Sequence, residues 1–208
     1  MDSKQALLKT AVFLAIITVF YNLVEGVVSV FLGLEDETLA LFGFGLDSFV
    51  EVISGIGIWH MVVRMRTSQE GEQDAFEKRA LTITGTAFYL LAAGLLISSV
   101  HNLAQGTQPE TTVWGVVIAA VSISVMGWLV YQKRKVGTSL GSDAILADAN
   151  CTRTCMQLSL VLLLASLGYE VLEIGRLDAL GALVIGGISF REGREAFNKS
   201  KNRDTCCG

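Results

Sequence analysis

Two pairs of potential metal ligands stand out in this 208-residue sequence, because each pair has the spacing of one helical turn. Asp47 and Glu51 are four residues apart, and so are Cys151 and Cys155. Residues four apart project from the same face of a helix. Carboxylates bind divalent cations, and thiolates bind soft or borderline ions such as Zn²⁺, Cd²⁺ and Cu⁺. Together the two pairs would supply the four ligands of a tetrahedral site.

Further polar residues accompany these pairs. Asp148 lies three residues before Cys151 on the same predicted face, as an alternative ligand, a group that supports a ligand, or a proton carrier. Asn22 and Glu25 belong to a polar stripe in the first apolar stretch, which indicates either hydrogen bonds between helices or the wall of a cavity for a hydrated ion. Near a metal site, each could support a ligand or relay protons. Arg153 points to the far side of the helix from Cys151, and we expect it to be a counter-charge to a carboxylate of a neighbouring helix.

The elements that must position these residues are apolar. Hydrophobic residues make up 51% of the chain and charged residues 17%, against about 25% charged in a soluble domain. The mean hydropathy is +0.52. The sequence therefore predicts an all-α membrane protein, with breaks at Lys133-Arg134-Lys135 and at Gly168-Tyr169-Glu170. Its six transmembrane helices are predicted at 6–33, 39–63, 80–100, 112–131, 142–167 and 174–191.

The depth of the acidic pair favours a functional site. Asp47 lies about a third of the way into the second predicted helix, and Glu51 lies near its middle. Carboxylates at such a depth cost several kcal/mol unless they are paired, protonated or bound to a metal.

The distribution of charge predicts the orientation. All of the 16 Lys and Arg residues except Arg153 and Arg176 fall at one side if both termini face the cytoplasm, in agreement with the positive-inside rule. We thus expect a six-helix domain over 1–191 and a short cytoplasmic tail over 192–208. In that tail Cys206 and Cys207 are a disordered thiol pair, a metal acceptor or an acylation site. A net charge of −4 argues against a nucleic-acid partner.

Three segments resemble the cation diffusion facilitator family. Leu41 to Glu51 (LFGFGLDSFVE) resembles the second helix of that family, which carries a His/Asp-x3-Asp metal motif. Asp143 to Cys155 (DAILADANCTRTC) resembles the fifth helix, where Cys151 stands at the usual His and Cys155 at the usual Asp. Leu177 to Gly193 resembles the sixth helix. The phenylalanine-glycine string is especially similar to a compact branch that includes a synaptic-vesicle zinc-efflux protein.

The resemblance implies a divalent cation efflux transporter, for Zn²⁺ or Cd²⁺, that exchanges metal for protons through Asp47, Glu51, Cys151 and Cys155. It implies a homodimer in the lipid bilayer, with the metal ion as substrate and no prosthetic group, and it does not imply an enzyme. We expect the cell (inner) membrane as the location. The sequence departs from the family in its two cysteines and in Glu51 instead of aspartate. We also expect that residues 192–208 do not form the C-terminal cytoplasmic metal-binding domain that is usual in the family.

Two alternatives come from other functional classes. A membrane thiol oxidoreductase would use Cys151, Cys155, Cys206 and Cys207, but it would leave Asp47 and Glu51 unexplained. A non-transporting metal-binding membrane protein would share the site but lack turnover. Proton-coupled flux in vesicles distinguishes this last class from a transporter.

Overall fold

The computed structural model describes residues 2–66, 75–106, 112–172, 174 and 176–201, and these residues form a bundle of helices with no strand among them. The prediction of an all-α protein with six helices is confirmed. The helices are α1 (Asp2–Glu35), α2 (Leu39–Arg66), α3 (Ala75–Gln105), α4 (Val113–Leu140), α5 (Asp143–Leu172) and α6 (Arg176–Lys201).

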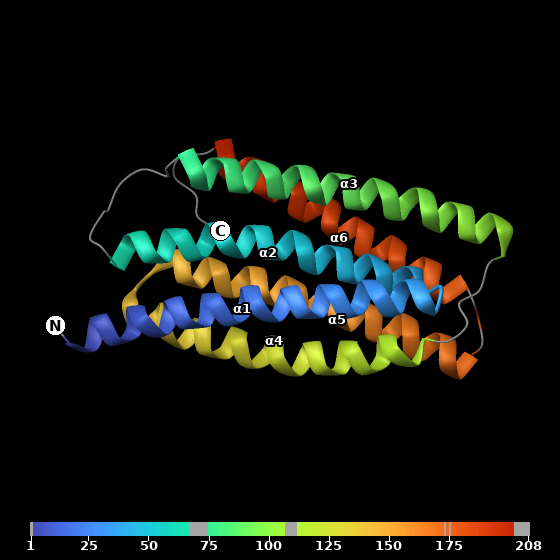
Figure 1. Cartoon of the computed structure of the whole chain (residues 1–208), viewed down its shortest axis with the longest axis horizontal. Coiled ribbons are helices and arrows are strands. Elements are labelled where there is room, and N and C mark those ends of the chain that lie inside the picture. Colours follow the sequence, from blue (N-terminus) through green and yellow to red (C-terminus); the bar gives the residue numbers. More distant parts are fainter. Residues whose placement is uncertain (1, 67–74, 107–111, 173, 175, 202–208) are drawn as a thin grey trace.

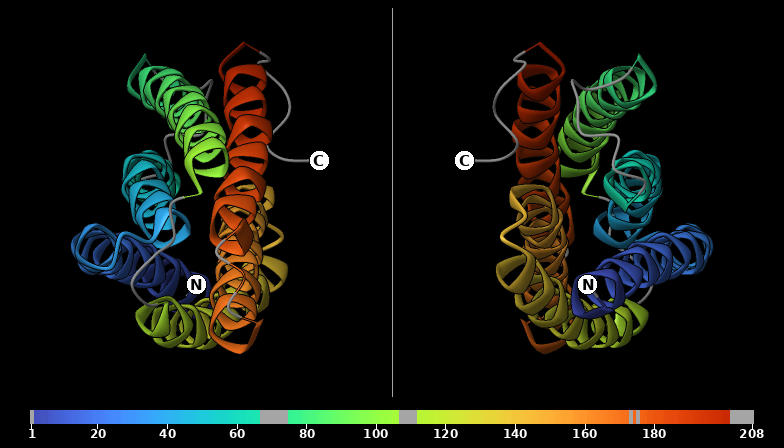
Figure 2. Two further views of the ribbon diagram at one scale, coloured as in Figure 1. Left: turned by 90° about the vertical axis from the view of Figure 1, so that its right-hand side faces the viewer. Right: turned by 90° about the vertical axis from the view of Figure 1, so that its left-hand side faces the viewer.

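The helices run along a common long axis and pack as three neighbouring pairs, α1 with α2, α3 with α6, and α4 with α5 (Figure 1). Seen along that axis, α3, α2 and α1 follow one another on one side and α6 and α5 lie on the other, with α4 between α1 and α5 (Figure 2). The start of α1 and the end of α6 lie at one end of the bundle, which we call the N-terminal end (Figure 1). Because α2 also contacts α5 and α6, side chains from these three helices can meet inside the bundle.

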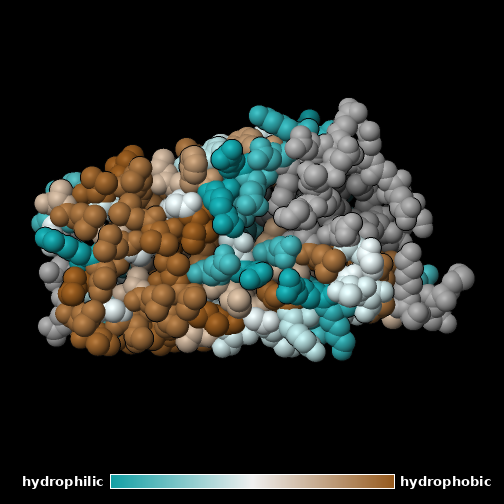
Figure 3. Space-filling view, turned by 180° about the vertical axis from the view of Figure 1, so that it is seen from behind, coloured by the Kyte–Doolittle hydropathy of each residue, from teal (hydrophilic) through white to brown (hydrophobic). Residues whose placement is uncertain are grey.

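Most of the helices have the length and apolar character of membrane spans. Among the described residues, five segments qualify, one each in α1 to α5, whereas α6 does not. The exposed side chains of α1 and α4 are correspondingly large and apolar, as at Phe20, Phe31 and Trp128. Apolar residues cover the half of one face that lies away from the N-terminal end, and hydrophilic residues gather across its middle (Figure 3). The apolar half has the character expected of a surface that faces lipid.

Several helices extend beyond the predicted ends. The predicted break at Lys133 is wrong, because α4 continues to Leu140 and ends at Gly141, whose φ of 59° suits glycine in the left-handed region. The break predicted at Gly168 is also wrong, since α5 runs on to Leu172. The boundary predicted after residue 191 falls inside α6, which continues to Lys201.

Small residues allow α1 and α2 to approach closely at the level of the acidic pair. A Cβ atom at Gly45 of α2 would lie 2.7 Å from the backbone nitrogen of Val30 on α1. A Cβ at Gly33 of α1 would likewise lie 2.5 Å from the backbone nitrogen of Phe42. Glycine at these positions therefore lets the two backbones touch, as is common between membrane helices.

The first turn of α2 is capped from another helix. The Asp178 carboxylate on α6 accepts hydrogen bonds from the backbone N–H groups of Leu39 (2.8 Å) and Ala40 (3.2 Å). These donors have no partner within their own helix, and a carboxylate suits the positive end of the helix dipole. Asp178 is buried and so ties α6 to the helix that carries Asp47 and Glu51.

Candidate metal site between α2 and α5

The centre of the candidate site is a contact between a carboxyl group and a thiol. Cys155 Sγ on α5 donates a hydrogen bond to Glu51 Oε1 on α2, at 2.5 Å. Cys155 is buried, and neither Cys151 nor Cys155 forms a disulfide. The structure thus joins one member of each predicted pair across 104 positions of sequence.

Asn22 on α1 completes the surroundings of Glu51. Its Nδ2 donates a hydrogen bond to Glu51 Oε2 at 3.2 Å. Its side-chain oxygen is buried and has no hydrogen-bond partner among the described residues. A buried amide oxygen without a donor is costly, and a cation bound beside Glu51 would satisfy it.

Asp47 lies one turn from Glu51 on α2 and is bound from α6. Ser189 Oγ donates a hydrogen bond to Asp47 Oδ1 at 2.8 Å, and both residues are buried. Asp47 is nevertheless near enough for its charge to act on Glu51 and on Cys155.

Cys151 is the more accessible of the two thiols, because it is half-buried. Cys155 Sγ lies 3.4 Å from the Cys151 backbone oxygen, as expected one turn apart on a helix.

The four predicted ligands are neighbours without forming a closed cage. Within the described part of the chain, no three acidic, cysteine or histidine side chains converge closely enough to hold a metal ion. Asp47 is held by Ser189 while Glu51 is held by Asn22 and Cys155. Binding by all four ligands would thus require Asp47 to exchange Ser189 for the ion and α2 and α5 to adjust.

Glu25, which was predicted as a proton relay or a supporting residue, forms a separate polar group beside the site. It accepts hydrogen bonds from Tyr21 Oη at 2.9 Å and from Ser48 Oγ at 3.2 Å. It is buried, and its charge acts on both Asp47 and Glu51. A second carboxylate therefore lies close enough to influence the charge of the centre.

Asp148 binds a buried lysine of α4. Its Oδ1 accepts a hydrogen bond from Lys133 Nζ on α4 at 2.8 Å, and both side chains are buried. Lys133 Nζ also donates to Thr152 Oγ1 at 2.9 Å. The sequence left Asp148 as an alternative ligand, a group that supports a ligand or a proton carrier, whereas in this structure its carboxylate pairs with the ammonium group of Lys133, which is none of these roles.

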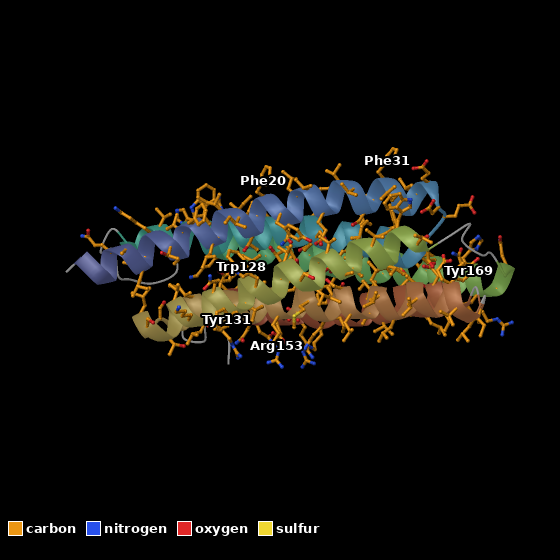
Figure 4. The ribbon with its side chains drawn as sticks, turned by 90° about the horizontal axis from the view of Figure 1, so that it is seen from below. Phe20, Phe31, Trp128, Tyr131, Arg153 and Tyr169 are labelled. Atoms are coloured by element: carbon orange, nitrogen blue, oxygen red, sulfur yellow. The ribbon has the colours of Figure 1, made fainter. Side chains whose placement is uncertain are left out.

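Arg153 points outward from α5, away from the carboxylates of the bundle (Figure 4). Its side chain is exposed, and it makes no ion pair with any residue that the structure describes. An arginine of this length can reach the polar edge of a bilayer along the outside of a helix. The predicted pairing with a carboxylate of a neighbouring helix is therefore not seen.

Three residues near the centre escaped the sequence analysis. Ser189 contacts Asp47, Glu192 lies near enough for its charge to act on Asp47 and Glu51, and Lys133 binds Asp148. A serine within the apolar start of α6 is a weak signal. Lys133 was hidden because it stands in a basic run that is typical of a loop. Cys206 and Cys207 lie outside the described residues.

Comparison with known proteins decides the family. The family model described as the cation efflux transmembrane domain matches residues 10–202. The chain belongs to the cation efflux family, the cation diffusion facilitators. As a member it carries a cation efflux transmembrane domain, and the members of this family are transporters and not enzymes.

Two yeast proteins are similar over shorter stretches. Mitochondrial metal transporter 2 of Saccharomyces cerevisiae is 35% identical over 106 residues, which are 50% of this chain and 22% of the relative. Mitochondrial metal transporter 1 of the same organism is 36% identical over 81 residues, 38% of this chain and 16% of the relative. The matched segments thus span less than a quarter of each curated relative.

Proposed function

We propose that this member of the cation efflux family exports a divalent cation, Zn²⁺ or Cd²⁺, in exchange for protons. Asp47, Glu51, Cys151 and Cys155 would be the ligands, and Asn22 would offer its amide oxygen. The observation that carries this proposal is the direct contact between Cys155 Sγ and Glu51 Oε1 across α2 and α5. A transport site needs ligands on helices that can move relative to one another, and this contact joins two different helix pairs.

The chemistry of the ligand set favours borderline and soft ions. Two thiolates and two carboxylates can complete a tetrahedral shell for Zn²⁺, and thiolates increase the preference for Cd²⁺. Harder ions such as Mg²⁺ and Mn²⁺ prefer oxygen ligands.

Proton exchange follows from the same groups. A thiol or a carboxyl group must lose its proton before it binds the metal. The Cys155–Glu51 hydrogen bond contains a proton that the metal would displace. Low pH on the releasing side would return protons to these groups and expel the ion.

The direction of transport depends on orientation. We propose that the N-terminal end of the bundle faces the cytoplasm, because the Lys and Arg residues of the sequence concentrate there. The cell membrane remains our prediction for the location, whereas the two yeast relatives are named as mitochondrial proteins.

Metal uptake into proteoliposomes tests the function. Purified protein is reconstituted, and uptake of Zn²⁺, Cd²⁺, Co²⁺ and Mn²⁺ is recorded with a lumen more acidic than the medium and with no pH gradient. We expect saturable Zn²⁺ and Cd²⁺ uptake that is accelerated by the acidic lumen, together with alkalinisation of the lumen. Metal binding without uptake would instead identify a non-transporting metal-binding protein.

We also propose that two copies of this chain form a homodimer. Light scattering combined with size-exclusion chromatography gives the protein mass after subtraction of detergent. Twice the chain mass of 22.4 kDa is expected.

A further inference from the structure

The proposed transport mechanism makes no use of Lys133, although its side chain is only 1% exposed. A lysine is rarely buried so completely without a charged partner. Its ammonium group is bound by two oxygen atoms of α5, Asp148 Oδ1 at 2.8 Å and Thr152 Oγ1 at 2.9 Å. Thr152 Oγ1 in turn lies 3.1 Å from the backbone oxygen of Asp148.

This ion pair lies directly beside the candidate ligands. Thr152 is the residue after Cys151, and Asp148 precedes Cys151 by three positions, so Asp148 and Cys151 share a face of α5. Toward the N-terminal end of the bundle, the thiols are therefore followed by the Asp148 carboxylate. This carboxylate is already paired with a positive charge of the protein itself, the Lys133 ammonium group.

The charge balance explains what the lysine does for the carboxylate. Removing one member of a buried ion pair leaves the other charge without compensation, which is strongly unfavourable. Asp148 without Lys133 would take up a proton or a cation. Its oxygen atoms are hard ligands, which favour Mn²⁺ and Mg²⁺ over Cd²⁺.

We propose that Lys133 is a specificity-determining positioning residue. Its ammonium group occupies the Asp148 carboxylate, which keeps a hard oxygen ligand out of the transport site and leaves the cation to the thiols, Asp47 and Glu51. This inference rests on the proposed metal site.

The test compares metal binding by the full-length protein in detergent, measured by isothermal titration calorimetry at pH 8 with Mn²⁺ and with Cd²⁺. Lys133→Met is expected to bind Mn²⁺ at least about tenfold more tightly than the parent. Adding Asp148→Asn should abolish that gain, because the gain needs the freed carboxylate. Lys135→Met is the matched control, since Lys135 is an exposed lysine of the same helix. It should bind both ions like the parent.

The inference is overturned if Lys133→Met binds Mn²⁺ no better than the parent, or if the gain survives in the double variant. If Lys133→Met does not fold, Lys133→Gln takes its place with the same expected gain, because glutamine carries no charge and its amide can still donate a hydrogen bond to Thr152 Oγ1. In the double variant, a Cd²⁺ affinity within about tenfold of the parent would support the inference. A larger loss in that variant would overturn the inference, because it would make Asp148 a ligand of the metal.

Failure of the proposed metal site looks different. Cys151→Ser combined with Cys155→Ser should lose Cd²⁺ binding. If this variant binds Cd²⁺ like the parent, both the metal site and the inference are wrong. If it loses Cd²⁺ while Lys133→Met gains no Mn²⁺, the inference alone is wrong.

Discussion

At the scale of single residues, the candidate site combines groups that bind one another. Glu51 is held by a thiol and an amide, and Asp47 is held by a hydroxyl group. A buried carboxylate needs such partners, because an unpaired charge inside a membrane is costly. The hydrogen bonds therefore keep the ligands in place for an incoming cation, which would have to displace them.

Removal of either carboxylate should stop transport. Asp47→Ala and Glu51→Ala are each expected to reduce the initial rate of Zn²⁺ uptake into proteoliposomes more than about 100-fold, since even groups that only support a metal ligand are worth 10–100-fold. Elution as a single symmetric peak in size-exclusion chromatography would show that the variants fold.

Glu35→Gln is the matched control, because Glu35 is an exposed carboxylate at the end of α1. Its uptake rate should equal that of the parent. Near-normal flux in both alanine variants would remove Asp47 and Glu51 from the site.

Exchange of the cysteines should change the preference between metals. Cys151→His with Cys155→Asp restores the ligand types that are usual in the family. We expect retained Zn²⁺ uptake and a lower rate for Cd²⁺, because thiolates favour the softer ion. The ratio of Cd²⁺ to Zn²⁺ uptake measures the effect. An unchanged ratio would mean that the two cysteines serve packing and not metal binding.

At the scale of the helices, the apolar stretches were sufficient to predict their number and order, but not where they end. Lys133 interrupts the apolar pattern and so predicts a break, yet α4 continues because Asp148 neutralises the lysine. The sequence alone does not show that Asp148 is the partner of Lys133, because Asp148 lies 15 positions away on another helix. The end of α4 is instead set by a local feature, the left-handed Gly141.

The site was predictable to a similar extent. Spacing of one turn predicted which residues share a face of α2 or α5, since that depends only on helix geometry. The contact between Glu51 and Cys155 depends on how two helices pack, and the binding of Asp47 by Ser189 depends on a third helix. Such contacts follow from tertiary packing, and the resemblance to a family supplied the grouping that spacing alone could not.

The packing of α1 against α2 leads to a prediction on stability. Gly45→Ala is expected to destabilise the protein by about 1–3 kcal/mol, because the new Cβ would meet the backbone of Val30 and the Cβ of Ser29 at 2.9 Å. The melting temperature in detergent should fall accordingly.

Gly94→Ala is the matched control in α3, where a Cβ would meet nothing within 4 Å. Its melting temperature should stay the same or rise, since alanine is the better helix former. Equal melting temperatures for the two variants would contradict the close approach of α1 and α2.

At the scale of the whole molecule, the exposed side chains indicate where one surface of the bilayer lies. Trp128 on α4 and Arg153 on α5 are both exposed. Trp128 lies five residues before Lys133 on α4, and Arg153 lies five residues after Asp148 on α5. Because Lys133 binds Asp148 and the two helices are antiparallel, Trp128 and Arg153 lie at about the same height along the bundle. Exposed tryptophan beside outward-reaching arginine is typical of the membrane interface. Arg153 stands between Cys151 and Cys155 along α5, so the candidate site lies at the height of that interface.

The orientation of the bundle is open to direct measurement, and it fixes the direction of transport. In a variant with all four cysteines replaced by serine, Lys135→Cys places an exposed thiol toward the N-terminal end, and Gln105→Cys places one at the end of α3. With the basic N-terminal end in the cytoplasm, a membrane-impermeant maleimide should label Gln105→Cys in right-side-out vesicles and Lys135→Cys only in inverted ones. The reverse pattern would turn the domain over, and the proposed efflux would become uptake.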